Sequence, residues 1–139
     1  MSAENKEISR RFTELFNSDD PSAVEEVFTP DCTLHLASGD VEGVEQMKGF
    51  IGAYRNAFPD AHSTIDRQVA EDEMVVTLWT ARGTHLGAFM GIEPTGRKFE
   101  ISGVTTEKVE GDRISEVWVT RDELSMMQQL GLIPQPQPA

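Results

Sequence analysis

Apolar residues in the first sixty positions recur at spacings typical of amphipathic helices. One stripe lies on a helix that closes near Asn17, and its members are Ile8, Phe12, Leu15 and Phe16. A second, short helix restarts at Asp20-Pro21. A third helix is predicted between Gly43 and Pro59, with an apolar stripe made of Val44, Met47, Ile51, Tyr54 and Phe58. The chain therefore opens with helices.

The rest of the chain alternates between apolar and polar residues, as half-buried strands do. A short strand is predicted at residues 32–37, and longer strands at residues 63–69, 74–85, 98–109 and 113–122. Polar turns join the long strands, which favours a bent antiparallel sheet, and a last helix follows at residues 123–130. Helices followed by a strand meander are the order of an α+β domain. We expect one domain over residues 1–132 and a disordered tail over residues 133–139.

Composition narrows the partners and the compartment. The 139 residues, 38% of them apolar, suit one hydrophobic core. With 24 acidic and 12 basic residues, the net charge of −12 repels nucleic acid and anionic membrane surfaces. No apolar run is long enough to span a bilayer and the charged N-terminus is unlike a signal peptide, so a cytoplasmic protein is expected. The lone Cys32 and the scattered histidines predict no disulfide and no metal site, and no cofactor motif occurs.

Two segments carry a resemblance to a known family. GTHLGAFMGIEPTGR occupies residues 83–97, and EVWVTRD, residues 116–122, stops at an aspartate just before a helical stretch that ends in QQLG. Together they resemble the SnoaL-like polyketide cyclases, a branch of the NTF2-like superfamily of cone-shaped α+β proteins. The resemblance implies a strongly bent antiparallel sheet wrapped around the N-terminal helices, and often a second subunit packed on the outer sheet face. A homodimer is therefore expected.

The same resemblance assigns the acid/base of an intramolecular aldol ring closure to Asp122, the aspartate before the last helix. The family is described as pairing this aspartate with a histidine on the preceding strand, where this chain has Thr105, Thr106 and Glu107. Asp122 shares a strand face with Trp118, because side chains two apart point the same way. Burial beside Trp118 would favour a protonated carboxyl suited to proton transfer. The competing interpretation is that Asp122 caps the following helix.

The opposite face of the last strand holds Val117, Val119 and Arg121. An ordinary core would take the valine face and turn Asp122 outward. A cavity for a flat hydrophobic ligand and one ionisable group instead favours the face with Trp118, and leaves the valines for a subunit contact. We therefore expect the tryptophan face to line the cavity.

Five further residues are candidates for the same cavity. His35, on the first strand, is either a second proton carrier or a rim histidine bonded to the backbone. His85 and Trp79 share one face of the second long strand, and they line the cavity if that face is the inner one. Tyr54 and Phe50 lie on the third helix, where the phenol needs a partner that a ligand or a backbone group would supply. His35 is predicted to act in catalysis beside Asp122, and the other four, like Trp118, to bind the substrate.

Three functions fit these residues. The first is a cofactor-free cyclase or isomerase in which Asp122 removes a proton beside a carbonyl of a small, polyketide-like substrate, while His35 or Tyr54 polarises the oxygen. The second is a protein that binds a small hydrophobic molecule without catalysis. The third is an assembly module whose cavity is filled by its own side chains. The first predicts a deep, mostly apolar pocket with Asp122 at its base.

Overall fold

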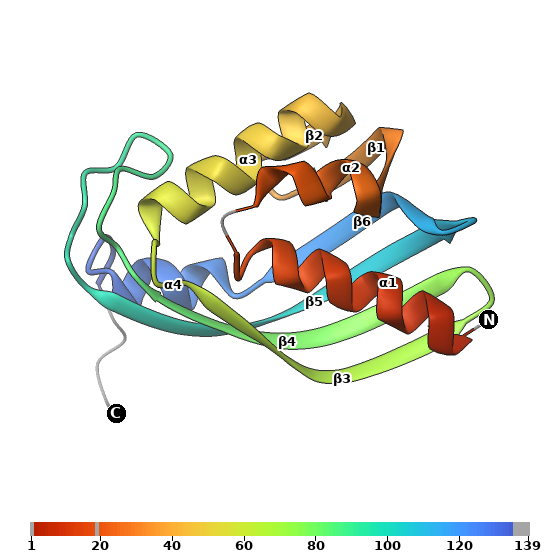
Figure 1. The fold of residues 1–139 in the computed structure, drawn as a ribbon. Helices are drawn as coiled ribbons and strands as arrows, with labels where there is room; N and C mark the ends of the chain where they lie inside the picture. Colours follow the sequence, from red (N-terminus) through yellow and green to blue (C-terminus); the bar gives the residue numbers. More distant parts are fainter. Residues whose placement is uncertain (1, 19, 135–139) are drawn as a thin grey trace.

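Helices cover one face of a curved, unclosed six-stranded sheet (Figure 1). The computed structural model describes residues 2–18 and 20–134. In chain order the elements are α1 (Ser2–Leu15), the 3-10 turn η1 (Pro21–Ala23), α2 (Val24–Val27), β1 (Phe28–Leu36), β2 (Gly39–Glu42), α3 (Gly43–Ala57), β3 (His62–Glu71), β4 (Met74–Thr84), β5 (Lys98–Glu110), β6 (Arg113–Arg121) and α4 (Glu123–Gln129). The predicted α+β order is confirmed. Most of the predicted disordered tail, residues 135–139, lies outside the described residues.

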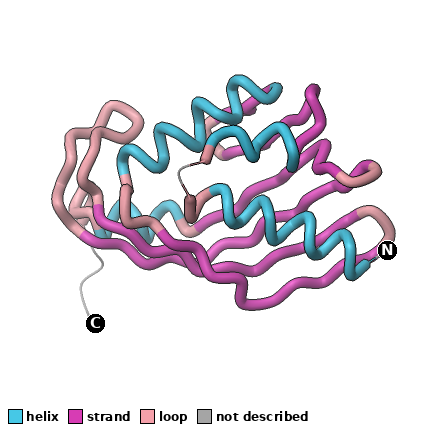
Figure 2. Tube along the Cα trace, viewed as in Figure 1, coloured by secondary structure: helices cyan, strands magenta, loops and turns pink. Residues whose placement is uncertain are grey.

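The strands lie side by side in the order β2-β1-β6-β5-β4-β3. All neighbours are antiparallel except β1 and β6, which run parallel. Register shifts between Ile65 and Arg67 and between Lys108 and Val109 mark bulges, which bend a sheet. The bend lets α1 and α3 cross the same face, as the cyan helices over the magenta strands show (Figure 2).

Two elements differ from those predicted. Strand β1 begins at Phe28 rather than at residue 32, because it runs through Pro30 beside an irregular stretch of the ladder with β6. Strand β2 is a four-residue edge strand with no apolar alternation to reveal it. Within the described residues, no helix is both long enough and apolar enough to cross a bilayer.

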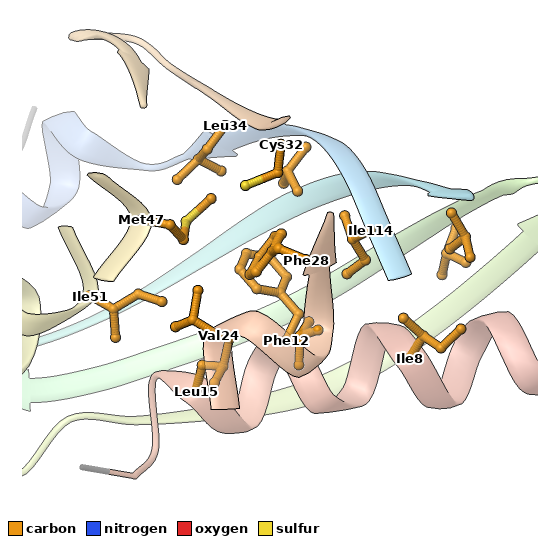
Figure 3. Packing of buried hydrophobic residues seen from close by; sticks show 14 residues of the cluster. Ile8, Phe12, Leu15, Val24, Phe28, Cys32, Leu34, Met47, Ile51 and Ile114 are labelled. Carbon is orange, nitrogen blue, oxygen red and sulfur yellow. The ribbon is translucent and has the colours of Figure 1, made fainter. Parts of the chain in front are cut away.

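The core forms two clusters that meet at Phe16. The first joins the inner sides of α1, α2 and α3 to β1 and β6, and includes the fully buried Val24, Leu34 and Met47 (Figure 3). The second lies around Phe58, at the end of the sheet where α4 packs. Phe16 packs against both clusters. A pocket lined by residues of both clusters lies between them.

Candidate functional site

A pocket opens between the two core clusters, over the inner face of the sheet. Phe12 and Phe16 of α1 line it on one side, and Phe50 and Tyr54 of α3 line it on another. Its space free of protein atoms, the open mouth included, is about 620 Å³. Tyr54 and Phe50 thus occupy the positions predicted for them. The side chains around this space therefore leave an open pocket rather than a completely filled core.

The inner face of β6 is the one that carries Val117, Val119 and Arg121. Register pairs Val119 with Thr105 and Arg121 with Gly103 on β5, and paired residues share a face. Val117 is fully buried, while Val119 and Arg121 line the pocket. The prediction that the tryptophan face of this strand lines the cavity is therefore wrong. The helices cover the apolar side of the strand, as they do in an ordinary core.

The structure corrects the predicted positions of Trp118 and Asp122. Trp118 is 39% exposed on the outer face of the sheet. Asp122 is exposed, and its Oδ1 accepts a hydrogen bond from the backbone N–H of Ser125 at 3.0 Å, so it is the N-cap of α4. An N-cap carboxyl satisfies an otherwise unpaired helix N–H. A catalytic role that depended on burial beside Trp118 has no support in this placement.

The buried acid of the pocket is Glu107 of β5, which is 1% exposed. Its Oε1 accepts a hydrogen bond from Ser9 Oγ at 2.8 Å, and Thr77 Oγ1 lies 3.4 Å from each carboxyl oxygen. Burial raises the pKa of Glu107 to about 8, although the hydrogen bonds from Ser9 and Thr77 oppose the rise. The carboxyl is therefore mainly protonated at neutral pH, with a minor carboxylate fraction that can accept a proton.

A polar network holds this carboxyl in place. Ser9 Oγ and Thr77 Oγ1 are 2.8 Å apart, and both residues are buried. Gln68 Nε2 donates to Thr77 Oγ1 at 3.3 Å and to the Lys6 carbonyl at 3.4 Å. The network thereby ties β3, β4 and β5 to helix α1. Both carboxyl oxygens of Glu107 have hydrogen-bond partners, so the network fixes the orientation of the buried carboxyl.

Trp79 of β4 lines the pocket, as predicted. Its Nε1 donates a hydrogen bond to Thr105 Oγ1 at 2.7 Å. Register pairs Trp79 with Gly103, and a Cβ added at Gly103 would overlap the indole atoms Cζ2, Cη2 and Cε2. The missing side chain at Gly103 lets the indole lie across β5. The pocket therefore has an aromatic wall whose position depends on one glycine.

Tyr54 and Arg121 place polar groups elsewhere on the pocket wall. Burial raises the pKa of Tyr54, and the positive charge of Arg121 opposes that rise. Among the residues that the structure describes, the Tyr54 hydroxyl has no hydrogen-bond partner. Arg121 Nε donates to Glu123 Oε1 at 3.1 Å. The phenol and the guanidinium are both available to a ligand oxygen.

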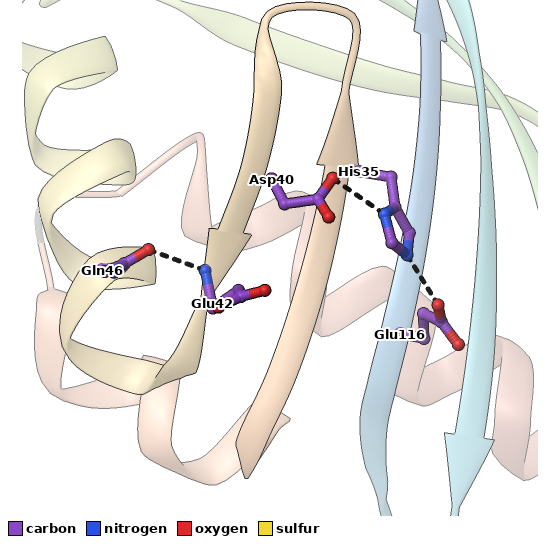
Figure 4. A network of polar contacts seen from close by, with 5 residues as sticks. All are labelled: His35, Asp40, Glu42, Gln46 and Glu116. Carbon is purple, nitrogen blue, oxygen red and sulfur yellow. Dashed lines mark hydrogen bonds and ion pairs between the residues drawn. The ribbon is translucent and has the colours of Figure 1, made fainter.

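His35 lies on the outer face of the sheet, away from the pocket (Figure 4). Its Nδ1 is 2.9 Å from Asp40 Oδ1 and its Nε2 is 2.6 Å from Glu116 Oε2, and its ring stacks on Trp118. The hydrogen bonds to Glu116 and then to Asp40 raise the pKa of His35, because they favour the imidazolium. Since Leu34 points to the core, alternation turns His35 outward. The predicted pocket role of His35 does not fit this position.

His85 is buried, but outside the pocket, in the loop that follows β4. Its Nδ1 accepts a hydrogen bond from the Thr95 backbone N–H at 3.2 Å, and its ring packs on Phe58. The Gly96 backbone N–H donates to the His85 carbonyl. His85 therefore joins the two ends of its loop, and the predicted ligand contact is not part of this geometry.

Sequence reasoning missed Glu107 and Arg121 as site residues. The available signal was alternation along β5, where Glu107 stands in step with the buried Ile101 and Thr105. A carboxyl on an otherwise buried strand face is a functional candidate, because burying a charge is costly. Within residues 2–18 and 20–134, no group of three or more His, Cys, Asp or Glu side chains could hold a metal ion.

A bent sheet with helices on its concave face and a pocket between them defines the NTF2-like class. Comparison with protein families matches residues 6–130 to the SnoaL-like polyketide cyclases. The chain belongs to this family. Comparison with the curated proteins found no match.

Solved structures of several bacterial proteins share the fold. IdmH of Streptomyces antibioticus, a proposed polyketide cyclase, is 31% identical, with a TM-score of 0.78 over 91% of this chain and 98% of that one. A proposed SnoaL-like polyketide cyclase from Jannaschia sp. CCS1 is 23% identical, with a TM-score of 0.87 over 96% and 95%. TsrD of Streptomyces laurentii is 24% identical, with a TM-score of 0.85 over 94% and 97%. The last two likenesses show the fold alone.

Proposed function

We propose that this protein is a cofactor-free acid/base catalyst of the cyclase or isomerase type, with Glu107 as the group that transfers the proton. The observation that supports it is a carboxyl almost fully buried on the wall of an apolar pocket. Burial raises the pKa of this carboxyl to about 8. A general acid or base works best when its pKa lies near the working pH. Asp122 and His35 do not share this environment.

The proposed step needs only a small carbonyl compound. The Glu107 carboxylate takes a proton from the carbon next to a carbonyl, leaving an enolate and a protonated Glu107. In a cyclisation that carbon then bonds to a second carbonyl carbon of the same molecule, and Glu107 returns its proton to the resulting alkoxide. In an isomerisation the proton returns to a different carbon. Atoms and charge balance in both cases without a cofactor.

The pocket supports a flat, hydrophobic substrate such as a polyketide-like ring system. Phe12, Phe16 and Phe50 offer apolar contact from the helices, and Trp79 offers an aromatic surface from the sheet. The unpartnered Tyr54 hydroxyl is a donor for the carbonyl oxygen that gains charge in the transition state. These groups bind and orient the substrate, and they leave the proton transfer to Glu107.

Proton exchange at carbon tests the proposal without knowledge of the natural substrate. 1-Tetralone, a flat bicyclic ketone, exchanges the protons next to its carbonyl for deuterium in D₂O, and NMR measures the rate. We expect the protein to accelerate this exchange and Glu107→Gln to lower the acceleration by about 100-fold or more. The rate should rise with pH and level off above about pH 8, as the carboxylate forms.

A matched control is Asp122→Asn, which removes the other candidate acid. It should leave the exchange rate unchanged, because asparagine also caps a helix. The proposal fails if the wild-type protein binds 1-tetralone without accelerating exchange. In that case the alternative function, binding of a small hydrophobic molecule without catalysis, is favoured.

We also propose that two copies pair through the outer face of the sheet. Val69, Leu78, Val104 and Trp118 are exposed there, and they replace Val117 and Val119, which the sequence had suggested for this contact. Light scattering after gel filtration should give twice the 15.4 kDa mass of one chain for the wild type. Val104→Arg should give the mass of one chain. A wild-type protein with the mass of one chain would refute the pairing.

A further inference from the structure

Arg121 brings a positive charge to the pocket wall. Its side chain is 13% exposed, and its single hydrogen bond within the described residues runs from Nε to Glu123. Guanidinium has five N–H donors, so the four on the Nη atoms have no acceptor among residues 2–18 and 20–134. Neither Nη atom of Arg121 is both buried and without a partner, and the residue lines the pocket. A ligand in the pocket can therefore reach a residue whose Nη donors are not already used.

The pocket contains no opposite charge to balance Arg121 in full. Of the residues that line it, only Glu107 carries an acidic side chain, and burial keeps that carboxyl mainly protonated at neutral pH. Glu123 does not line the pocket, and its side chain is 41% exposed. Water therefore weakens its electrostatic attraction to Arg121. An anionic group inside the pocket would be attracted to the guanidinium with little opposing charge.

Arg121 lies at the other end of the pocket floor from Glu107. Register pairs Arg121 with Gly103, whereas Glu107 pairs with Val117, four residues away along each strand. Four residues of strand span about 13 Å between Cα atoms. The Glu123 partner holds the guanidinium near the start of α4, beyond the end of β6. Arg121 is therefore placed to bind a part of the substrate remote from the atom that loses its proton.

The aromatic wall lies next to this guanidinium. Trp79 extends across β5 at Gly103, the register partner of Arg121. A flat ring packed on the indole would lie in the same pocket as Arg121, Thr105 and Glu107. Arginine binds a carboxylate through two parallel N–H donors in one plane, which suits a substituent on the edge of a flat ring.

We propose that the ligand is an aromatic or polyketide-like acid whose carboxylate pairs with the Nη donors of Arg121. The inference rests on the proposed function, since it assumes that the same pocket holds the substrate. It adds a specificity-determining residue and a substrate class, an anionic rather than a neutral carbonyl compound. Glu107 performs the proton transfer, and Arg121 selects and orients the molecule.

Two ligands of equal shape test the charge preference. 2-Naphthoate is the anion of a flat bicyclic acid, and 2-naphthamide is its neutral counterpart. Calorimetry at about pH 6.5, where Glu107 is mainly protonated, should give wild-type protein a Kd for the acid at least about tenfold lower than for the amide. In Arg121→Met the two values should agree within about twofold, and Arg121→Lys should keep part of the preference.

Arg82→Met is the matched control for the loss of one positive charge. Arg82 is half exposed and pairs with Glu100, outside the pocket, so this variant should keep the full preference for the acid. Equal affinity of wild-type protein for the two ligands overturns the inference, as does a preference that survives in Arg121→Met. Absence of binding of both ligands at millimolar concentration also overturns it. The wild-type comparison decides the matter even if Arg121→Met does not fold.

The binding experiment tests the role of Arg121, and the exchange experiment tests the role of Glu107, so either role can be refuted without the other. Glu107→Gln should lose the exchange activity and keep the preference for 2-naphthoate, because glutamine retains the size of the protonated acid. If the preference holds and no exchange is catalysed, the anion site stands and the proposed catalysis falls. If exchange is catalysed and the preference is absent, the catalysis stands and the role of Arg121 falls.

Discussion

Glu107 lies on the inner face of β5, whereas Asp122 follows the end of β6 and caps the start of α4. Glu107 points toward the helices, is 1% exposed and bonds to two buried hydroxyls. Asp122 points toward water and bonds to the first turn of α4. We propose that one carboxyl transfers a proton, whereas the other stabilises a helix end. The surroundings of each carboxyl, a buried polar network or a solvent-exposed helix end, distinguish the two.

The polar clusters on the two faces differ in the same way. On the inner face, Ser9 and Thr77 hold Glu107 inside low-dielectric surroundings, where each hydrogen bond affects proton affinity strongly. On the outer face, Asp40 and Glu116 flank His35 where water screens the charges. Exposed ion pairs of that kind contribute little to stability. Function should therefore depend on the inner cluster, which the following experiments examine in order of expected effect.

The largest effect concerns Glu107 and pH. Folding raises its pKa from 4.5 to about 8, so the folded protein holds the proton more tightly than the unfolded chain. The stability that this tighter proton binding contributes to the folded protein is complete below about pH 4.5, and it is lost as the pH rises to about 8. The loss is on the order of 5 kcal/mol in the free energy of unfolding. Urea denaturation across this range should show it in the wild type.

Glu107→Gln is the matched variant, because glutamine resembles the protonated acid and does not titrate. Its free energy of unfolding should lack this fall with pH, so the difference between the two proteins grows from pH 5 to pH 8. Parallel profiles for variant and wild type would show that Glu107 is ionised in the folded protein. That result would also remove the basis of the proposed proton transfer.

The next effect concerns the aromatic wall. Gly103→Ala puts a methyl group where the Trp79 indole now lies, so the ring must move and its bond to Thr105 must weaken. Overpacking of this kind costs about 1 to 3 kcal/mol of stability, and the affinity for 2-naphthoate should fall. Gly49→Ala is the control, since nothing lies within 4 Å of its Cβ and α3 should gain helix propensity. Equal behaviour of both variants would contradict the role of Gly103.

Periodicity alone was enough to predict most of the fold. The stripe that includes Phe12 and the stripe that includes Met47 identified the two helices that cover the sheet, and alternation identified the long strands. The parallel pairing of β1 with β6 could not be predicted from periodicity, because it joins segments about 80 residues apart and has no local sequence signal. Strand β2 was missed because pairing with β1, rather than its own pattern, makes it a strand.

The site was harder to predict than the fold, since alternation gives two faces without saying which one meets the helices. Trp118 suggested the wrong face because its large aromatic ring is compatible with burial, yet it stacks on His35 at the surface. The sequence drew attention to Glu107 only as one of three residues in the region where the family has a histidine. Its burial results from packing of β5 against α1, which local sequence does not contain.

A smaller effect is expected from Ser9→Ala. The Ser9 hydroxyl favours the carboxylate form of Glu107, so its removal should raise the pKa of Glu107 further. It should also cost about 1 to 2 kcal/mol of stability, because a buried oxygen loses its donor. The pH at which the exchange rate of 1-tetralone levels off should shift upward by a measurable amount. A downward shift would show that Ser9 stabilises the protonated acid instead.

The smallest effect is expected at Asp122, the carboxyl that caps α4. Asp122→Asn should change stability by less than about 0.5 kcal/mol, since both residues are good N-caps, while Asp122→Ala should cost about 1 kcal/mol through the unpaired Ser125 N–H. Exchange of 1-tetralone protons should be the same in both variants and the wild type. The two substitutions distinguish the possible roles. If Asp122 is only an N-cap, alanine lowers stability and asparagine does not. If Asp122 carries the proton, both substitutions abolish exchange. If asparagine abolished exchange while stability stayed unchanged, Asp122 would be the acid/base after all, and its side chain would have to reach the substrate.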